Sequence, residues 1–320
     1  MKIHILTYTR RDKEEGSQWT QLEMLRKSAE KSGHELELIY ANECQLKFFK
    51  KPEILVNNKK PEIDILLVKA GFLGVESTAH VSLIKQFELD GVSVVNKHYA
   101  VRVSKNKVQN IQVLQKHGVP TPKTMVVRSA EMLEDVIKDV GKFPLILKTS
   151  SGSLGVGVAI IESKRAMQSI VEMLHGQRHV SVVIQEYIRE SSGKDIRAFV
   201  VGNKVVAAME RIARKRGEFR SNYSLGGKVR KVKLTDKELR LAIKAAKACE
   251  LEMAGVDIIR TKKGPMVLEV NANPGIEGIT EATGIDVAGE IIKYCVKKAK
   301  AEKRRLKKLA QEKKAKRANR

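Results

Sequence analysis

Residues 254–275 read Ala-Gly-Val-Asp-Ile-Ile-Arg-Thr-Lys-Lys-Gly-Pro-Met-Val-Leu-Glu-Val-Asn-Ala-Asn-Pro-Gly. Two apolar runs, 256–260 and 266–271, flank the polar residues 262–264, which are Lys-Lys-Gly. Short apolar runs on either side of a polar turn that contains glycine are typical of a β-hairpin. We therefore predict an antiparallel pair of strands in this segment.

Each predicted strand carries one carboxylate within its apolar run, Asp257 in the first and Glu269 in the second. Asn271 lies two residues beyond Glu269 and on the same face, because side chains alternate along a strand. Antiparallel pairing would bring the three side chains close together. Buried carboxylates need a counter-charge, and two carboxylates with an amide are hard oxygen ligands that suit Mg²⁺ bound to substrate phosphates. The alternative is an ordinary hairpin with acids that face solvent.

The composition is typical of a soluble globular protein, with 42% hydrophobic and 31% charged residues in a chain of 320. No apolar run approaches the roughly 20 residues needed to span a bilayer. Met1 and Lys2 lead directly into a strand-like stretch without a signal-peptide pattern. The three cysteines lie far apart, which excludes a cysteine-based zinc ribbon and indicates a reducing compartment. We expect a cytoplasmic protein of two or three domains.

Positive charge is concentrated at the C-terminal end of the chain. The segment 297–320 holds 13 Lys and Arg residues and two Glu residues, a net charge of +11 out of +24 for the whole chain. A charge of this size favours acidic partners such as nucleic acid or an acidic protein. We expect a final helix from about residue 286, and the tail either extends this helix or frays from it. The tail could contact RNA, or it could be a solvated run of charge.

The pattern of apolar residues divides the rest of the chain into three blocks. Residues 1–98 alternate between strand-like and helix-like segments, which predicts an α/β domain with a mostly parallel sheet. No G-x-G-x-x-G follows its first strand, so nothing there indicates dinucleotide binding. Residues 99–190 contain further strands and helices, and residues 191–296 are rich in strands before they become helical. The fold class that we predict is α/β, with α+β character in the C-terminal part.

A segment rich in Gly and Ser, 150–157, separates two predicted strands. Its glycines let backbone N–H groups approach an anion closely, so it could close over a triphosphate, although glycine-rich hairpin turns are also common. Lys148 lies in the apolar strand before it, where a lysine is costly without a negative partner. A lysine that snorkels from a strand end is the alternative. Lys107, on a helix predicted over 104–117, is a second candidate phosphate contact.

Further polar groups occur in or beside apolar strands. Residues 185–188, Gln-Glu-Tyr-Ile, end one strand and could present their backbone to an adenine edge. Asp195, Arg197 and Arg211 lie in the next two predicted strands, and the planar arginine fork binds carboxylate or phosphate bidentately. Ordinary strand ends and structural salt bridges are the alternatives. Paired metal-ligand histidines and a G-x-S-x-G elbow are absent from the sequence, so positioning and electrostatics are favoured over covalent catalysis.

The order of these motifs resembles the ATP-grasp ligases and, within them, the RimK group, which adds glutamate to the C-terminus of a ribosomal protein. The resemblance covers nearly all of residues 1–296 and is most specific at 210–222 and 275–286. The chain differs from the group at residues 68–71, where it has Val-Lys-Ala-Gly in place of Pro-Arg-x-Gly. The domains that the resemblance implies are an N-terminal Rossmann-like pre-ATP-grasp domain over 1–98, a central subdomain with the phosphate loop over 99–190, a C-terminal ATP-grasp subdomain with the metal site over 191–296, and a basic tail over 297–320.

The resemblance also assigns roles to single residues. The ATP contacts that it implies are Lys107, Lys148, Ser151, Gly152, Ser153, Gly155, Gln185, Glu186, Tyr187, Ile188, Asp195 and Arg211. Two Mg²⁺ or Mn²⁺ ions would bind Asp257, Glu269 and Asn271, and Arg211 would be the catalytic residue that supports the transferring phosphoryl group. The implied substrate contacts are Lys69, Arg197, Arg220, Ser221 and Asn222.

The reaction that the resemblance implies is ATP-dependent amide formation through an acylphosphate. L-glutamate, or a similar acidic amino acid, would be added to the C-terminus of a peptide or protein such as a ribosomal protein. Synthesis of poly-α-glutamate is a variant, because each product again ends in a glutamate carboxylate. The alternatives are another amino-acid ligase that acts on a carrier protein or a cofactor, and a basic nucleic-acid-associated protein that binds ATP. By the same resemblance we expect a homo-oligomer with no membrane partner.

Overall fold

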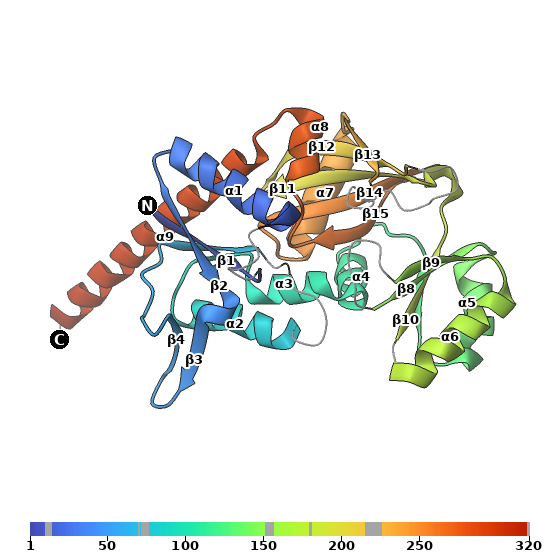
Figure 1. Ribbon diagram of the computed structural model, residues 1–320, viewed down its shortest axis with the longest axis horizontal. Helices are drawn as coiled ribbons and strands as arrows, with labels where there is room; N and C mark the ends of the chain where they lie inside the picture. Colours follow the sequence, from blue (N-terminus) through green and yellow to red (C-terminus); the bar gives the residue numbers. More distant parts are fainter. Residues whose placement is uncertain are drawn as a thin grey trace. The chain divides into compact units, whose positions relative to one another are not determined.

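The computed structural model describes residues 1–9, 15–69, 71, 77–150, 157–178, 181–214 and 226–318. The chain contains two compact units, whose helices and strands are labelled in Figure 1. The first unit comprises Met1–Phe72, Ser77–His98 and Asp286–Arg320, and the second comprises Leu73–Glu76 and Tyr99–Ile285. None of the helices in the described ranges has the length and apolar composition needed to cross a bilayer.

The first unit is built on a parallel sheet with the strand order β2-β1-β5-β6, as predicted for residues 1–98. Both central strands, β1 and β5, are buried along nearly their whole length, which is typical of parallel strands that are covered on both faces. Helix α1 packs against α9, and α9 packs against β5. The bounds of these elements are β1 Lys2–Thr7, α1 Gly16–Lys31, β2 Glu35–Tyr40, β5 Ile65–Lys69, α2 Ser77–Leu89, β6 Val94–Val95 and α9 Val287–Ala318.

One feature of this unit goes beyond the predicted elements. Strands β3 (Cys44–Phe48) and β4 (Pro52–Val56) pair as a separate antiparallel hairpin. Helix α9 runs without a break through residue 296, which confirms the alternative that the basic tail extends the final helix (Figure 1). The division of the sequence into four functional parts remains a prediction.

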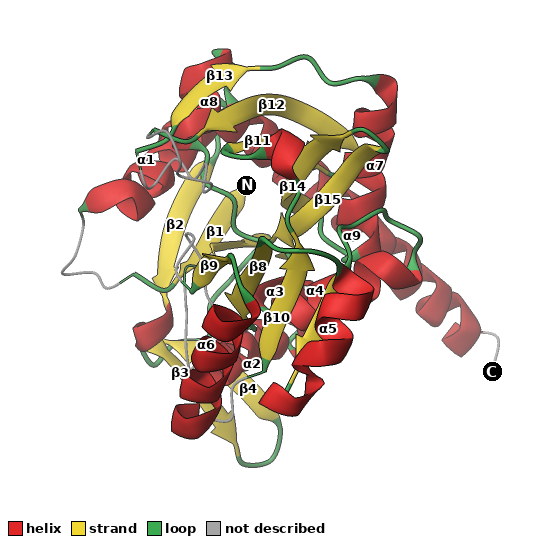
Figure 2. Ribbon diagram, turned by 90° about the vertical axis from the view of Figure 1, so that its right-hand side faces the viewer, coloured by secondary structure: helices red, strands yellow, loops and turns green. Residues whose placement is uncertain are grey.

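The second unit contains an antiparallel sheet with the strand order β7-β10-β8-β9. Helices α5 and α6 lie beside this sheet (Figure 2), and Leu145 and Leu147 of β8 belong to the apolar cluster that the helices bury. Because side chains alternate along a strand, Lys148 lies on the opposite face, away from the two helices. The bounds are β7 Thr124–Val127, α5 Leu133–Val140, β8 Leu145–Thr149, β9 Val158–Ile161, α6 Lys164–Arg178 and β10 Val182–Glu186.

A second antiparallel sheet of this unit has the strand order β13-β12-β11-β14-β15. The hairpin predicted within residues 254–275 is present as β14 (Met253–Thr261) and β15 (Gly264–Asn271), which confirms both strands and the turn between them. Helix α7 packs against β11, β12, β14 and β15, and α8 packs against β12 and β13. The remaining bounds are β11 Lys194–Val201, β12 Lys204–Ile212, β13 Lys228–Lys231, α7 Asp236–Ala248 and α8 Glu277–Thr283. The predicted fold class, α/β with α+β character in the C-terminal part, is confirmed.

The prediction of one continuous helix over 104–117 is wrong. The structure has two helices, α3 (His98–Lys105) and α4 (Lys107–Lys116), separated at Asn106. The Asn106 side chain accepts hydrogen bonds from the backbone N–H groups of Val108 and Gln109, each at 3.0 Å. Asparagine is among the preferred N-cap residues, so Asn106 ends one helix and starts the next. As a result, Lys107 is the first residue of α4.

Helix α7 begins with a capping box that supplies a test of the fold. Thr235 Oγ1 accepts a hydrogen bond from the Glu238 N–H at 3.3 Å, and the Glu238 side chain accepts one from the Thr235 N–H at 2.9 Å. We predict that Thr235→Ala lowers the free energy of unfolding by about 1 kcal/mol, because the cap is lost. Thr235→Ser keeps the hydroxyl and should stay within about 0.5 kcal/mol of the parent. Urea unfolding measures both values, and equal losses for Ala and Ser would contradict the assignment.

Candidate active site

The antiparallel register of the five-stranded sheet brings predicted site residues onto one face. Asp195 lies opposite Arg211, Arg197 lies opposite Asp257, and Asp257 lies opposite Glu269. Residues that oppose each other on neighbouring strands point to the same side, and so do residues two apart on one strand. Asn271 follows Glu269 by two positions and therefore joins them. The residues on this face are Asp195, Arg197, Arg211, Asp257, Glu269 and Asn271.

Two arginines and two aspartates form a buried ion-pair network on this face. Arg197 donates to both oxygens of Asp257, from Nε to Oδ1 and from Nη2 to Oδ2 at 2.8 Å. Arg211 donates to both oxygens of Asp195, from Nε to Oδ1 at 2.6 Å and from Nη2 to Oδ2 at 2.8 Å. Arg211 Nη2 also lies 2.8 Å from Asp257 Oδ2. Arg211 therefore joins the two bidentate pairs and fixes the two carboxylates relative to each other.

The network keeps Asp257 ionised, although the residue is only 3% exposed. Burial raises the pKa of the Asp257 carboxyl, but the charges of Arg197 and Arg211 outweigh burial and hold this pKa below its usual range. Burial lowers the pKa of the Arg211 guanidinium, and Asp195 and Asp257 more than restore it, so this pKa lies above its usual value. An ionised carboxylate is the form that binds a metal cation. Asp257 is thus held in the state that the predicted metal site requires.

Glu269, Asn271 and Asn273 add further oxygen donors beside the network. Glu269 Oε1 accepts a hydrogen bond from Asn271 Nδ2 at 3.0 Å. Asn273 Oδ1 is buried and has no hydrogen-bond partner among the described residues. Within the same described part of the chain, no group of three or more His, Cys, Asp or Glu side chains is arranged to hold a metal. The oxygen donors in this region are two carboxylates and side-chain amides. This set fits Mg²⁺, which keeps water and phosphate oxygens among its ligands.

Asn273 was not assigned a role from the sequence. The signal was the spacing in Asn-Ala-Asn-Pro, which repeats an amide side chain two positions after Asn271. An orphaned buried oxygen is costly, so Asn273 Oδ1 is a plausible fourth donor for a cation in this region.

Lys148 is half-buried on the face of the four-stranded sheet that the helices leave uncovered. Its Nζ donates to Gln185 Oε1 at 2.8 Å, and Gln185 Nε2 donates to Thr124 Oγ1 at 2.9 Å. Burial lowers the pKa of the Lys148 ammonium, and nearby Glu269 opposes this shift while Lys107 reinforces it. Thr124, which the sequence did not single out, thus fixes Gln185, and Gln185 fixes the lysine. The structure brings Lys148 into the electrostatic reach of the acidic face.

Lys107 connects the start of α4 with the base of the predicted phosphate loop. Its backbone N–H donates to the Ser150 carbonyl at 3.0 Å, and burial lowers the pKa of its ammonium while Glu269 raises it. The Thr149 N–H donates to the Gly157 carbonyl at 3.0 Å and closes the loop. Gly157 has a φ of +74°, and a Cβ there would lie 2.5 Å from Thr149 Oγ1, so only glycine fits. The predicted contacts Ser151, Gly152, Ser153 and Gly155 lie outside the described residues.

The predicted adenine segment follows the end of β10. The Glu186 N–H donates to the Lys123 carbonyl at 2.8 Å, and Tyr187 Oη donates to Ser192 Oγ at 2.5 Å. Tyr187 and Ile188 are half-buried and lie in an irregular segment. The Ile188 carbonyl accepts a hydrogen bond from the Ser191 N–H at 3.1 Å. The adenine contact of this segment remains a prediction.

The structure describes two of the five predicted substrate residues, one in each unit. Lys69 belongs to the first unit, where it is only 6% exposed and its Nζ donates to Gln21 Oε1 at 3.1 Å. Arg197 belongs to the second unit and is held by Asp257. Arg220, Ser221 and Asn222 lie outside the described residues. The roles of all five in substrate binding remain predictions.

Two residues that the sequence analysis missed hold β15 in place. Asn110 of α4 donates from Nδ2 to the Val270 carbonyl at 3.1 Å and accepts from the Val270 N–H at 3.2 Å. Ser104 Oγ accepts a hydrogen bond from the Ala272 N–H at 2.9 Å. Val270 and Ala272 are the neighbours of Glu269 and Asn271 in the chain, so α3 and α4 fix the backbone that carries the candidate metal ligands. No local pattern in the sequence identifies such a long-range contact.

Glycine at position 255 leaves room for the network. A Cβ at Gly255 would lie 2.9 Å from Arg197 Cδ and 2.7 Å from Pro274 Cβ. The Arg197 side chain therefore lies across the backbone of β14 in the space that a larger residue would fill, and from there its guanidinium reaches Asp257.

The comparisons with known proteins agree with this architecture. Residues 104–295 match the family model of the RimK-like ATP-grasp domain. A probable alpha-L-glutamate ligase of Vibrio vulnificus is 39% identical over 292 residues, which cover 88% of this chain and 93% of that protein. A probable alpha-L-glutamate ligase of Coxiella burnetii is 39% identical over 279 residues, which cover 86% of this chain and 91% of that protein.

Solved structures share the fold at lower identity. The ATP-grasp ligase PsnB complexed with minimal precursor has a TM-score of 0.71 at 17% identity, covering 92% of this chain and 98% of that chain. A RimK domain ATP-grasp protein from Sphaerobacter thermophilus has a TM-score of 0.66 at 20% identity, covering 92% of this chain and 100% of that chain. The fold is therefore that of the ATP-grasp enzymes. The chain belongs to the RimK-like ATP-grasp family and is an ATP-dependent ligase.

The contact between Asn110 and Val270 gives a test of how the site is held. We predict that Asn110→Ala lowers the free energy of unfolding by about 1–3 kcal/mol, because the buried N–H and C=O of Val270 lose their partners. Lys116→Ala, an exposed change on the same helix, should stay within about 0.5 kcal/mol of the parent. Urea unfolding of both variants provides the comparison. A loss for Asn110→Ala no larger than for Lys116→Ala would show that the contact does not hold β15.

Proposed function

We propose that this ATP-dependent ligase joins the amino group of L-glutamate, or a similar acidic amino acid, to a carboxylate at the C-terminus of a peptide or protein. The observation that carries the proposal is the buried network in which Arg211 joins Asp195 and Asp257 beside Glu269. The names of relatives that are 39% identical over most of the chain support glutamate as the amino acid.

The charges around the site suit a nucleotide triphosphate with its metal ions. Four cationic side chains, Lys107, Lys148, Arg197 and Arg211, stand against the carboxylates of Asp195, Asp257 and Glu269. The surplus of positive charge favours a polyphosphate, and the carboxylates favour the divalent cations that accompany it. In this proposal Lys107 and Lys148 contact the phosphates, residues 150–157 close over them, and residues 185–188 hold the adenine. Asp195 lies on the nucleotide side and holds Arg211.

Asp257, Glu269 and Asn271 are the residues that would hold the metal, with Asn273 available as a further donor. We propose two ions, Mg²⁺ or Mn²⁺. When bound, they neutralise charge on the β- and γ-phosphate oxygens. Arg197 and Arg211 keep Asp257 ionised for this role, and α3 and α4 keep β15 fixed. The ion pairs of Asp257 and the hydrogen bonds that hold β15 are all formed within the protein.

The reaction proceeds in two steps. A carboxylate oxygen of the acceptor attacks the γ-phosphorus of ATP, the bond to the β–γ bridging oxygen breaks, and ADP leaves. The amino group of the amino acid then attacks the carbonyl carbon of the acylphosphate, inorganic phosphate leaves, and the nitrogen loses a proton to give the amide. We propose that the Arg211 guanidinium stabilises the negative charge of the transferring phosphoryl group. We propose Arg197, Lys69, Arg220, Ser221 and Asn222 as contacts for the anionic substrates.

Several classes of molecule could supply the acceptor carboxylate. A ribosomal protein C-terminus is one candidate, and free glutamate chains are another, since each addition regenerates a C-terminal glutamate carboxylate. A carrier protein or the acidic tail of a cofactor is the rival acceptor for a ligase of this family. These candidate reactions differ only in the acceptor, because the residues that bind the nucleotide and the metal would be the same in each. We also propose a homo-oligomer as the active form.

Glu269→Gln is the sharpest test of the metal assignment. It replaces a proposed ligand without removing a charge from the arginine network, because Glu269 accepts its hydrogen bond from Asn271. We predict that kcat for ADP release falls by about 100-fold or more, since charge stabilisation in the transition state is lost, while the free energy of unfolding changes by less than about 1 kcal/mol. Glu162→Gln, an exposed change in the same unit, is the matched control.

Asp257→Asn is a less direct test, because it also leaves two buried arginines with one carboxylate fewer and should destabilise the fold by about 3 kcal/mol. A Glu269→Gln variant that retains parental turnover over a range of Mg²⁺ concentrations would exclude Glu269 from the metal site.

Lys148→Met tests the phosphate contact. We predict that ATP affinity falls by about 10- to 100-fold, the equivalent of one charge-assisted hydrogen bond, while Lys142→Met on the same subdomain leaves it unchanged. The pKa of Lys148 lies below that of a free lysine, so raising the pH removes its charge earlier than usual and ATP affinity should fall with it. Isothermal titration calorimetry at several pH values measures both effects. Equal affinities for parent and Lys148→Met would remove Lys148 from the site.

A further inference from the structure

Helix α9 presents a row of cations along one side. Lys293, Lys297, Lys300, Arg304 and Lys307 follow one another at alternating intervals of four and three residues. Side chains at these intervals lie on the same face of an α-helix. We refer to these five residues as the cationic stripe. At a rise of 1.5 Å per residue the stripe extends over about 21 Å.

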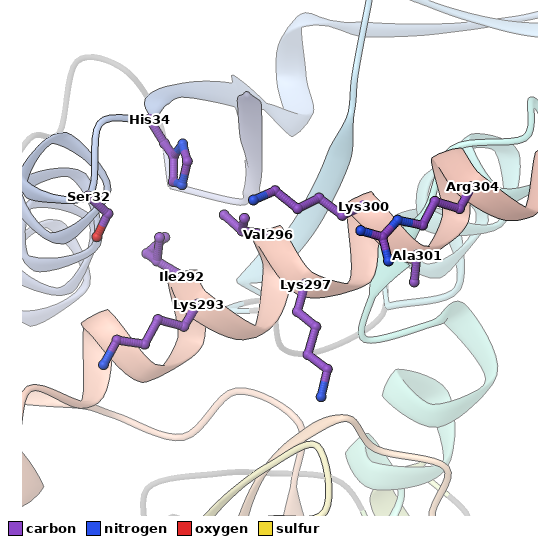
Figure 3. A pocket seen from close by; sticks show the side chains of 9 residues that line it. All are labelled: Ser32, His34, Ile292, Lys293, Val296, Lys297, Lys300, Ala301 and Arg304. Carbon is purple, nitrogen blue, oxygen red and sulfur yellow. The ribbon is translucent and has the colours of Figure 1, made fainter.

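The first part of the stripe borders a pocket with a volume of about 420 Å³ within the first unit. Figure 3 shows Ile292 and Val296 of α9 facing Ser32 and His34, while Lys293 and Lys297 extend outward from the helix. The pocket thus combines an apolar floor with a cationic rim. The full lining is Ser32, His34, Ile292, Lys293, Val296, Lys297, Lys300, Ala301 and Arg304.

The cations of α9 between residues 287 and 308 fall into two groups, according to whether they have an anionic or carbonyl partner. The first group has anionic or carbonyl partners, namely Glu290 for Lys293, the Val94 carbonyl for Lys298, Asp64 for Lys303 and Glu302 for Arg305. The second group has no ion-pair partner within the described ranges, and it consists of Lys297, Lys300, Arg304, Lys307 and Lys308. Four of these five belong to the cationic stripe. Lys297, Lys300 and Arg304 are also exposed to solvent.

We propose that the cationic stripe and its pocket bind nucleic acid through the phosphate backbone. The stripe is several times longer than a single small anion, so its ligand carries a row of negative charges. A nucleic-acid strand carries one phosphate about every 3.4 Å, so a row of about 21 Å faces several phosphates in succession. Lysine binds phosphate as a point charge and arginine binds it as a bidentate fork, so all five cations suit such a backbone.

The pocket also indicates how the nucleic acid is recognised. Its lining residues, all of them in the described part of the chain, include no Trp, Tyr or Phe on which bases could stack. Contacts limited to phosphates fix a backbone without reading its sequence. Binding should therefore be independent of sequence, similar for RNA and DNA hairpins, and strongly dependent on salt.

The test uses the full chain and fluorescein-labelled RNA and DNA hairpins of equal length, with fluorescence anisotropy read from 50 to 200 mM salt. The variant is Lys297→Gln/Lys300→Gln/Arg304→Gln. Its matched control is Lys50→Gln/Lys59→Gln/Lys60→Gln, which removes the same charge from exposed residues of the same unit. We expect the stripe variant to bind about 10- to 100-fold more weakly at 0.1 M salt and its salt slope to fall by about 2 to 3. The control should bind like the parent.

Three outcomes would overturn the proposal. Equal weakening in the stripe variant and the control would show that only net charge matters. Absence of binding to either hairpin at 50 mM salt would exclude a nucleic-acid site. Tighter binding of an oligoglutamate peptide than of the hairpins, lost in the stripe variant, would assign the stripe to an acidic protein partner. Circular dichroism confirms that each variant is folded, and ATP-dependent ligation is measured alongside.

Discussion

Arg211 is the residue on which the rest of the site depends. It is buried between two aspartates from neighbouring strands, and its single guanidinium neutralises parts of both. Without that charge, Asp195 would lose its bidentate partner and Asp257 would be left with Arg197 alone. With it, burial still raises the pKa of the Asp257 carboxyl, but the charges of Arg197 and Arg211 together hold this pKa below its usual range. The chemistry proposed for the site, metal binding by a carboxylate and transfer of a charged phosphoryl group, needs the ionised form of this carboxyl.

The backbone around the network is fixed by contacts from distant parts of the second unit. Asn110 and Ser104 hold β15 on both sides of the proposed ligands, and Gly255 leaves space for Arg197 to reach Asp257. On the other sheet, a relay from Thr124 through Gln185 orients Lys148. These contacts fix the charged side chains, or the backbone that carries them, before any substrate binds. Electrostatic catalysis requires this form of preorganisation. The cationic stripe of α9 belongs to the other unit.

The parts of the fold that depend on local sequence patterns could be predicted from the sequence. The hairpin of β14 and β15, the capping box at Thr235 and the parallel first sheet follow from residue periodicity and turn chemistry. The break at Asn106 was missed, because a helical pattern on both sides concealed the N-cap. The sequence identified the charged residues of the network but not their pairing, because pairing depends on strand register across 16 to 60 positions. Asn110 and Thr124 carried no local signal.

The central claim is ATP-dependent addition of glutamate to a carboxylate, and product analysis tests it most directly. The protein is incubated with ATP, Mg²⁺ and each amino acid in turn, with and without a peptide acceptor, and ADP release is measured together with the masses of the products. The account predicts ADP release that depends on glutamate and a ladder of products separated by one glutamate residue. Release of ADP with another amino acid and not with glutamate would contradict the substrate. No amide product with any amino acid or acceptor, under conditions where ATP binds, would contradict the proposed reaction.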